Sequence, residues 1–205
     1  DLVIGADGAY SAVRAALQRS DRFEYSQSFL PHGYKELTIP PLPDGGFRME
    51  RDALHIWPRE RFMMIALPNV DGSFTCTCFW PFAGISGFDR LQSDAAIHTY
   101  FGEHFPDAVP LMPTLVEDFK RNPSSALVTV RCSPWHLRDK ALLIGDAAHA
   151  IVPFYGQGAN AGFEDVGVLM RHIDTHKGDW SRVFGEFSGE RKPNANAIAD
   201  MALAN

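Results

Sequence analysis

A stretch toward the carboxyl end of the chain, GDAAHAIVPFYGQGANAGFED at residues 145–165, combines residue types that can hold a ligand. Asp146 follows an apolar run and so lies at the carboxyl end of a predicted strand, where its carboxylate can accept hydrogen bonds from sugar-like hydroxyls. Gly156 and Gly158 allow positive φ and the close approach of a planar ring. The predicted helix that follows offers free N–H groups and a positive dipole end. The pattern predicts a site for a ligand that gains negative charge, such as the pyrimidine edge of a reduced flavin.

The amino end of the chain carries a second arrangement of this kind. Residues 2–4 read as a buried strand, a turn at 5–8 follows it, and Ser11 offers an N-cap for a helix that reaches about Gln18. A strand, a turn and a helix in this order are typical of a nucleotide-binding α/β layer. Because the chain opens directly on this apolar strand, without an initiator Met, we expect a further part of the protein upstream.

Between these two segments the predicted elements change to a β-sheet. Residues 53–57, 61–67 and 73–80 are strand-like, and the turn at 69–72 joins the last two as a hairpin. Both faces of these strands are largely apolar, which predicts a sheet covered on both sides, by helices on one face and with a ligand as the candidate on the other. Further predicted elements are helices at 93–104 and 114–121, strands at 126–131 and 141–144, and helices at 160–173, 180–189 and from 193 onward.

The order of these elements predicts one layered domain that is interrupted by another. Residues 1–20 and 136–175 are assigned to a cofactor-binding domain, residues 21–135 to an inserted β-sheet substrate domain, and residues 176–205 to a C-terminal helical segment. The fold class is therefore α/β, with an α+β character within this chain.

Composition excludes several classes of function. The 205 residues carry a net charge of −6 without a Lys/Arg cluster, which argues against a nucleic-acid partner. The longest apolar runs have the length of core strands, so no membrane segment is predicted. Cys76, Cys78 and Cys132 are predicted to be reduced core thiols of a cytoplasmic protein. No His/Cys spacing suits zinc, so no metal site is predicted.

The two ligand-binding segments together resemble the internal motifs of the flavoprotein aromatic hydroxylases, the group that contains p-hydroxybenzoate hydroxylase. Asp7-Gly8 followed by SAVR at 11–14 is similar to the DG motif of that group, and residues 145–165 are similar to its second FAD fingerprint. Within the insert, LHIWPR at 54–59, FMMIALPN at 62–69 and FGEHFPDAVP at 101–110 resemble the kynurenine 3-monooxygenase family. The resemblance implies a Rossmann-like FAD-binding domain interrupted by a mixed β-sheet substrate domain, with the GxGxxG fingerprint upstream.

The resemblance implies FAD and NADPH as cofactors. Asp146 would hold the ribityl–pyrophosphate part of FAD, and the backbone at Ala159 and Asn160 would meet the flavin pyrimidine ring. Asp7 and Arg14 would organise the pyrophosphate side or the face where NADPH docks. The implied cofactor-binding residues are Asp7, Ala12 (through its backbone), Arg14, Asp146, Gly156, Gly158, Ala159 and Asn160.

The resemblance also implies that the ring of L-kynurenine packs against the inserted sheet beside the flavin. NADPH would reduce FAD, O₂ would be captured as a flavin C4a-hydroperoxide, and the ring would be hydroxylated at C3, giving 3-hydroxykynurenine and water. No side chain is an obvious catalytic base, and His149, the nearest candidate, reads better as a structural histidine. The implied substrate-binding residues are Leu54, Met63, Ile65, Leu67 and Phe79 of the insert and Pro153, Phe154 and Tyr155 of the loop.

Three other interpretations stay open at this point. They are a hydroxylase of another aromatic acid, a flavin-dependent prenyl reductase with a sheet insert, and a non-enzymatic lipid carrier of the Rab-escort type. The LHIWPR and FMMIALPN segments argue against the reductase, and the intact GD segment argues against the carrier. Because the family's carboxylate-binding residues should lie outside these 205 residues, the chain alone is expected not to turn over substrate.

Overall fold

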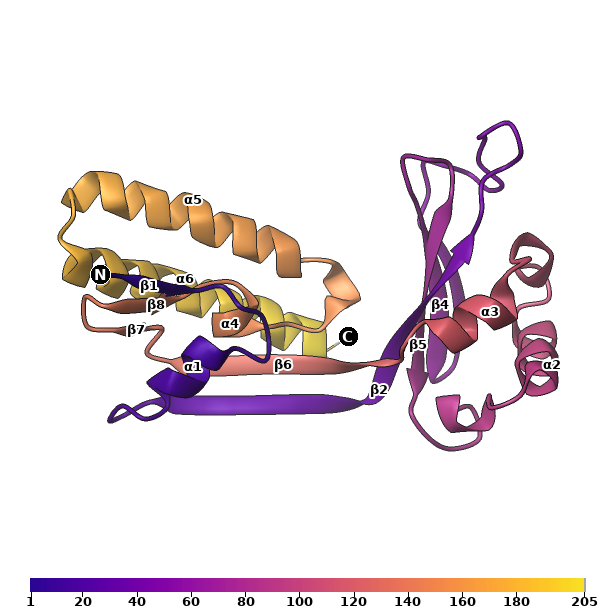
Figure 1. Cartoon of the computed structure of the whole chain (residues 1–205), viewed down its shortest axis with the longest axis horizontal. Helices are drawn as coiled ribbons and strands as arrows, with labels where there is room; N and C mark the ends of the chain where they lie inside the picture. Colours follow the sequence, from indigo (N-terminus) through magenta and orange to yellow (C-terminus); the bar gives the residue numbers. More distant parts are fainter. Residues whose placement is uncertain (205) are drawn as a thin grey trace. The chain divides into compact units, whose positions relative to one another are not determined.

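The computed structural model describes residues 1–204, which form two compact units (Figure 1). Unit 1 contains residues 1–29 and the chain from residue 128 onward, and unit 2 contains Leu30–Leu127. Strands β2 (Glu24–Ile39) and β6 (Ser125–Ser133) run through the two boundaries. The four-part domain division given above places its boundaries at other residues and stays a prediction.

Unit 1 is built on a three-stranded sheet in the order β1-β8-β7. β1 (Val3–Gly5) pairs parallel with β8 (Ala141–Leu143), and β8 pairs antiparallel with β7 (His136–Leu137). Because parallel strands end at the same edge of a sheet, this pairing brings the turn after β1 next to the turn after β8. The helices of the unit are α1 (Ala12–Leu17), α4 (Asp146–His149), α5 (Gly158–His176) and α6 (Trp180–Leu203), with a 3₁₀ turn, η3, at Pro153–Tyr155.

The core of unit 1 forms between β8 and α6. Leu142 and Leu143 are fully buried, as are Phe184 and Phe187 of α6. β1 was predicted to be a buried strand, and that prediction is right about the strand but wrong about its burial, since Val3 and Ile4 are about half exposed. The reason is its place in the sheet: β1 lies at the edge of the strand order, so a neighbouring strand shields it on one side only.

Helix α6 corrects a second prediction. The sequence suggested one helix ending near residue 189 and another starting at Pro193, whereas α6 runs without interruption from Trp180 to Leu203 and contains Pro193. A proline inside a helix removes one backbone hydrogen bond and costs about 3 kcal/mol. The buried face of α6 continues on both sides of the proline, through Phe187 before it and Ala195 and Ala199 after it, and this packing offsets the cost.

Unit 2 contains most of a five-stranded sheet in the order β3-β4-β5-β2-β6, with β3 at His55–Arg59, β4 at Phe62–Pro68 and β5 at Phe74–Pro81. The β3–β4, β4–β5 and β2–β5 pairs are antiparallel, and the predicted β4–β5 hairpin is confirmed. The helical elements are α2 (Asp94–His104) and α3 (Leu115–Arg121), with short 3₁₀ turns η1 (Phe88–Arg90) and η2 (Val109–Leu111).

The two faces of this sheet differ in burial. Met64, Cys78 and Trp80 are fully buried in an aromatic-rich core shared with α2 and α3. Figure 1 shows these two helices beside the sheet. The opposite face carries Ile65, which is partly exposed, and Leu67, which is about half exposed. The predicted helix cover is therefore confirmed for one face. On the second face neither α2 nor α3 packs among the described residues, and the ligand expected there stays a prediction.

Most of the remaining predicted elements are confirmed within a few residues, including α2 with its Ser93 N-cap and α3 after Thr114. The long strand β2 was missed. Among the helices of residues 1–204, none combines the length and the hydropathy that a bilayer span needs.

Candidate functional site

A cleft of about 710 Å³ lies in unit 1 where the two sequence motifs meet. Ala6 and Gly8 reach it from the turn after β1, and Gly145 and Asp146 reach it from the turn after β8. The parallel pairing of β1 with β8 explains this meeting, because it places both turns at one edge of the sheet. The other lining residues are Ile144, Ile151, Pro153, Gly156, Gly158, Ala159, Gly162, Phe163 and Val166.

Glycines keep this cleft open. Gly145 (φ +57°) and Gly156 (φ +62°) have left-handed backbone conformations that residues with a side chain adopt only with strain. Gly158 does not share this conformation and instead begins α5. A Cβ built on any of these three glycines would meet no protein atom within 4 Å, so each of them exposes bare backbone.

The amino end of α5 borders the cleft through Gly158 and Ala159. Gln157 stands at the N-cap position but makes no side-chain cap to the helix backbone. The first N–H groups of this 19-residue helix therefore have no capping side chain, and the helix dipole adds partial positive charge at the same place. This end of α5 suits a planar ligand with an anionic edge.

Asp146 is the first residue of α4, a one-turn helix that the sequence analysis did not predict. Its side chain is exposed and lines the cleft, so the carboxylate is available to accept hydrogen bonds from a bound ligand. Ala147 and Ala148, which follow it, are fully buried against the core of unit 1. The short helix thus fixes the backbone on one side and leaves Asp146 facing the cleft.

The Asp7 carboxylate organises the start of α1. Its Oδ1 accepts a hydrogen bond from Ser11 Oγ at 2.5 Å, and its Oδ2 accepts the backbone N–H groups of Ala12 (2.8 Å) and Val13 (3.2 Å). The Ser11 hydroxyl is the main reason why the pKa of Asp7 lies below its usual range. Asp7 is therefore ionised and shapes the turn whose neighbours, Ala6 and Gly8, line the cleft.

Arg14 is almost completely buried. Its guanidinium donates to the carbonyl oxygens of Ala147 at 2.8 Å and Ala9 at 2.5 Å, so it ties α1 to α4. The cation also lies 4.9 Å from the centre of the Tyr25 ring. Among residues 1–204, the cleft lining includes neither Asp7, Ala12 nor Arg14, so the structure favours a positioning role for these three.

Beneath the cleft lies a buried ionic network centred on Asp165 of α5. Asp165 Oδ2 accepts the backbone N–H of Gly145 at 2.8 Å and a hydrogen bond from His149 Nε2 at 2.6 Å, and Oδ1 accepts from Arg191 Nε at 2.8 Å. Burial alone would raise the pKa of Asp165, but the hydrogen bonds and charges of His149 and Arg191, with the Gly145 N–H, lower it on balance. His149 packs against Trp135, with ring centres 4.9 Å apart. The network fits the structural role expected of His149.

Neither Asp165 nor Arg191 was predicted from the sequence to have a role in the site. A signal for Arg191 was present, since it lies on the same helical stripe as Phe184, Phe187 and Ala195, all of which are buried. A charged residue on an apolar stripe needs a buried partner of opposite charge, which Asp165 provides. The identity of that partner depends on how α5 packs on α6, and helical periodicity does not contain that information.

The residues predicted to contact substrate fall into two groups. Met63 pairs with Phe79 across the β4–β5 ladder, and Ile65 and Leu67 lie on the same face of the sheet as this pair. Leu54 precedes β3 and is about half exposed. This group belongs to unit 2, whereas Pro153, Phe154 and Tyr155 form the 3₁₀ turn before α5 in unit 1. Their joint role in one pocket stays a prediction.

Comparisons with known proteins identify the family. A model described as the FAD binding domain matches residues 1–202. Kynurenine 3-monooxygenase of Flavobacterium psychrophilum is 53% identical over 205 residues, which cover 100% of this chain and 46% of that protein. The enzymes of the same name from Dictyostelium discoideum (49% identity, 99% of this chain, 47% of that protein) and Sus scrofa (48%, 100%, 43%) are also similar. The chain spans about half the length of the curated relatives it matches.

Solved structures show the same fold. A tetrameric form of 2-methyl-3-hydroxypyridine-5-carboxylic acid oxygenase superposes with a TM-score of 0.77 at 22% identity, covering 98% of this chain and 52% of that one. An FAD complex of a Klebsiella pneumoniae HpxO variant gives a TM-score of 0.74 at 22% identity, covering 98% and 51%. These likenesses confirm the predicted fold class. On the family match and on identities of 48–53%, the chain belongs to the FAD binding domain family and is similar to kynurenine 3-monooxygenases over its whole length.

Proposed function

We propose that the protein carrying this chain is an FAD- and NADPH-dependent monooxygenase that hydroxylates L-kynurenine to 3-hydroxykynurenine. The observation that carries the proposal is the cleft at the amino end of α5, where the turns after β1 and β8 meet. It occurs in a chain that is about half identical to proteins named kynurenine 3-monooxygenase. Because the chain spans about half their length, we expect the 205 residues alone to give no turnover.

The residues of the cleft fit FAD. Bare backbone at Gly156 and Gly158 leaves room for a flat ring system, and Ile151 and Val166 supply apolar lining. Bound FAD would supply the redox chemistry, accepting reducing equivalents from NADPH and passing them to O₂. The Asp146 carboxylate would accept hydrogen bonds from hydroxyls of the bound cofactor.

The amino end of α5 would hold the charged edge of the cofactor. The N–H groups at Ala159 and Asn160 belong to the uncapped first turn. A helix N-terminus that faces a developing negative charge in a partly buried site stabilises it by up to about 2 kcal/mol. Asp7, Ala12 and Arg14 would act behind this site, by fixing the turn after β1 and the position of α4.

The open face of the unit 2 sheet would receive the aromatic ring of the substrate. Met63, Ile65 and Leu67, beside the buried Phe79, give this face an apolar surface, which would keep water away from the ring during hydroxylation. Leu54 would extend this surface from the residue before β3. The substrates are then L-kynurenine and O₂, and a cytoplasmic location is proposed from the three free, buried cysteines.

A substrate panel tests the proposal. The full-length protein is supplied with NADPH and, separately, with L-kynurenine, anthranilate, p-hydroxybenzoate and buffer alone, and NADPH oxidation is compared with hydroxylated product. We expect stoichiometric product with L-kynurenine only. If another aromatic acid is hydroxylated and L-kynurenine is not, the chain belongs to a different hydroxylase. If the purified protein contains no flavin, the proposed enzymatic role is wrong.

A matched pair of variants tests the cofactor site. Asp146→Ala removes the carboxylate that lines the cleft, and we expect weaker FAD retention after gel filtration. Asp174→Ala removes an exposed carboxylate from α5 outside the cleft lining and should retain FAD as the wild type does. Equal FAD retention by both variants would contradict the role given to Asp146.

A further inference from the structure

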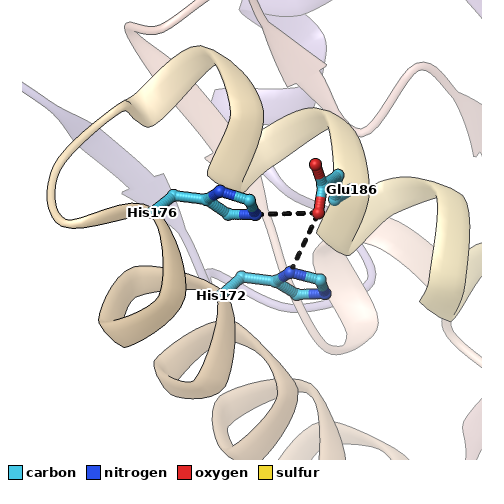
Figure 2. Close-up of side chains that lie close together, drawn as sticks. All are labelled: His172, His176 and Glu186. Carbon is cyan, nitrogen blue, oxygen red and sulfur yellow. Dashed lines mark hydrogen bonds and ion pairs between the residues drawn. The ribbon is translucent and has the colours of Figure 1, made fainter.

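Two histidines and a glutamate converge where α5 turns into α6 (Figure 2). His172 and His176 lie four residues apart near the carboxyl end of α5, and Glu186 reaches them from α6. Glu186 Oε2 lies 2.8 Å from His176 Nε2 and 3.7 Å from His172 Nδ1. One ligand atom from each of the three residues lies within 4.8 Å of the others.

This arrangement matches the coordination chemistry of a divalent transition metal. Histidines at i and i+4 present their rings on one face of a helix, which is the spacing that zinc sites use when two ligands come from one helix. A tetrahedral Zn²⁺ with ligands at about 2.0–2.1 Å separates its ligand atoms by about 3.3 Å. The two distances to Glu186 lie on either side of this value.

Neighbouring side chains support the cluster from outside. Glu190 Oε2 accepts a hydrogen bond from His172 Nε2 at 3.0 Å, which leaves Nδ1 of the same ring turned toward Glu186. Arg171 in turn holds the other oxygen of Glu190. A carboxylate on the far nitrogen of a ligating histidine fixes the ring and its tautomer, and such partners typically accompany metal-bound histidines.

Burial is graded in a way that suits a metal site. The side chains of His172 and His176 are only 13% and 12% exposed, whereas that of Glu186 is 53% exposed. Solvent can therefore reach the cluster from the glutamate side, where a water molecule could complete a fourth coordination position.

We propose that His172, His176 and Glu186 form a binding site for a Zn²⁺-class divalent metal ion that joins α5 to α6. The His/Cys spacings along the chain did not predict a metal site. The third ligand of the cluster comes from the next helix, so no local spacing reveals it. The site lies at the carboxyl end of α5, whereas the proposed flavin site uses its amino end. The proposal therefore does not depend on the monooxygenase function.

Calorimetric titration of the full-length, tag-free, chelator-treated protein with Zn²⁺ tests the proposal. We expect about one equivalent to bind to the wild type. Glu186→Gln and His176→Gln should abolish this binding event, since each removes a ligand. Glu190→Gln removes only the outer partner of His172 and should weaken the affinity by about 10- to 100-fold.

The control is His98→Gln, which removes an exposed histidine of α2 and should bind Zn²⁺ like the wild type. Circular dichroism of each variant checks that the helices are intact, and the exposed Glu186 makes its variant the least disruptive. The absence of a one-equivalent binding event in the wild type would overturn the proposal, and the three residues would then serve only as a hydrogen-bonded contact between α5 and α6. Unchanged Zn²⁺ affinity in both Glu186→Gln and His176→Gln would overturn it equally.

Discussion

The carboxylate of Asp165 accepts a hydrogen bond from the backbone N–H of Gly145 at 2.8 Å. This bond joins α5 to the turn that carries Asp146 into the cleft, and His149 and Arg191 hydrogen-bond to the same buried carboxylate. The geometry of the proposed cofactor site therefore depends on an ionic network that does not itself line the cleft.

Replacing Asp165 with Asn should destabilise unit 1. The substitution removes the buried carboxylate partner of Arg191 and leaves this cation only the exposed Glu164, and removal of one member of a buried pair costs about 3–5 kcal/mol. Urea denaturation followed by circular dichroism measures the free energy of unfolding. Glu164→Gln is the matched control, because Glu164 also contacts Arg191 but is 60% exposed, so we expect a loss below about 1 kcal/mol. Equal losses for the two variants would contradict this account of the network.

The same carboxylate predicts how stability depends on acid. The pKa of Asp165 is lowered in the folded protein by the groups that face it, which are His149, Arg191 and the Gly145 N–H. In the unfolded chain the pKa of an aspartate is about 3.9, so as the pH falls the unfolded chain binds this proton before the folded protein does. The stability that ionised Asp165 contributes is therefore fully present above about pH 3.9 and is lost as the pH falls through the folded pKa. The urea concentration at the midpoint of unfolding should fall less steeply with decreasing pH, between about pH 5 and pH 3, in Asp165→Asn than in the wild type. If the unfolding midpoint of the variant depends on pH as that of the wild type does, other carboxylates, such as Asp7, account for the loss of stability in acid.

Two glycine variants distinguish the role of backbone conformation in stability from the role of open space in FAD binding. Gly156→Ala forces a side chain into a left-handed conformation and should cost about 1 kcal/mol of stability. Gly158→Ala lies at the start of α5 without that conformation, so the free energy of unfolding should hardly change. Its new methyl group points into open space beside the cleft, and we expect it to weaken FAD binding, as measured by fluorescence titration of the apoprotein. Unchanged FAD affinity in Gly158→Ala would contradict the position proposed for the flavin ring.

Neighbouring residues of β4 should respond in opposite ways. Met64 is fully buried under the helices of unit 2, so Met64→Ala should lower the free energy of unfolding by about 2–5 kcal/mol. Ile65 lies on the open face, so Ile65→Ala should cost less stability and should raise KM for L-kynurenine instead. Steady-state kinetics and urea denaturation of both full-length variants distinguish the two effects. A normal KM in Ile65→Ala would remove this face from the substrate site.

Local signals in the sequence were sufficient for much of the fold. Ser11 and Ser93 cap the helices that they were predicted to cap, and the turn at 69–72 between two strand-like runs placed the β4–β5 hairpin correctly. β2 was missed because Pro31 and Gly33 lie within it and read as strand breakers, although the strand continues through them with its ladder to β5.

The candidate site was less predictable than the motifs that form it. Asp146, Gly156, Gly158 and Ala159 line the cleft as expected from their segment. The buried position of Arg14 depends on packing between elements that are far apart in the chain. The helical pattern of α6 places Arg191 on the buried face but does not identify Asp165 as its partner. The metal-ligand cluster at the end of α5 was missed for the same reason, since Glu186 belongs to another helix.

Labelling with ¹⁸O₂ tests whether the protein is a kynurenine monooxygenase. The full-length protein is incubated with NADPH and L-kynurenine under ¹⁸O₂ in unlabelled water, and the product is analysed by mass spectrometry. A monooxygenase of the proposed kind should give 3-hydroxykynurenine with one ¹⁸O atom in the new ring hydroxyl. Unlabelled product, or NADPH oxidation that yields no hydroxylated kynurenine, would contradict the proposed function.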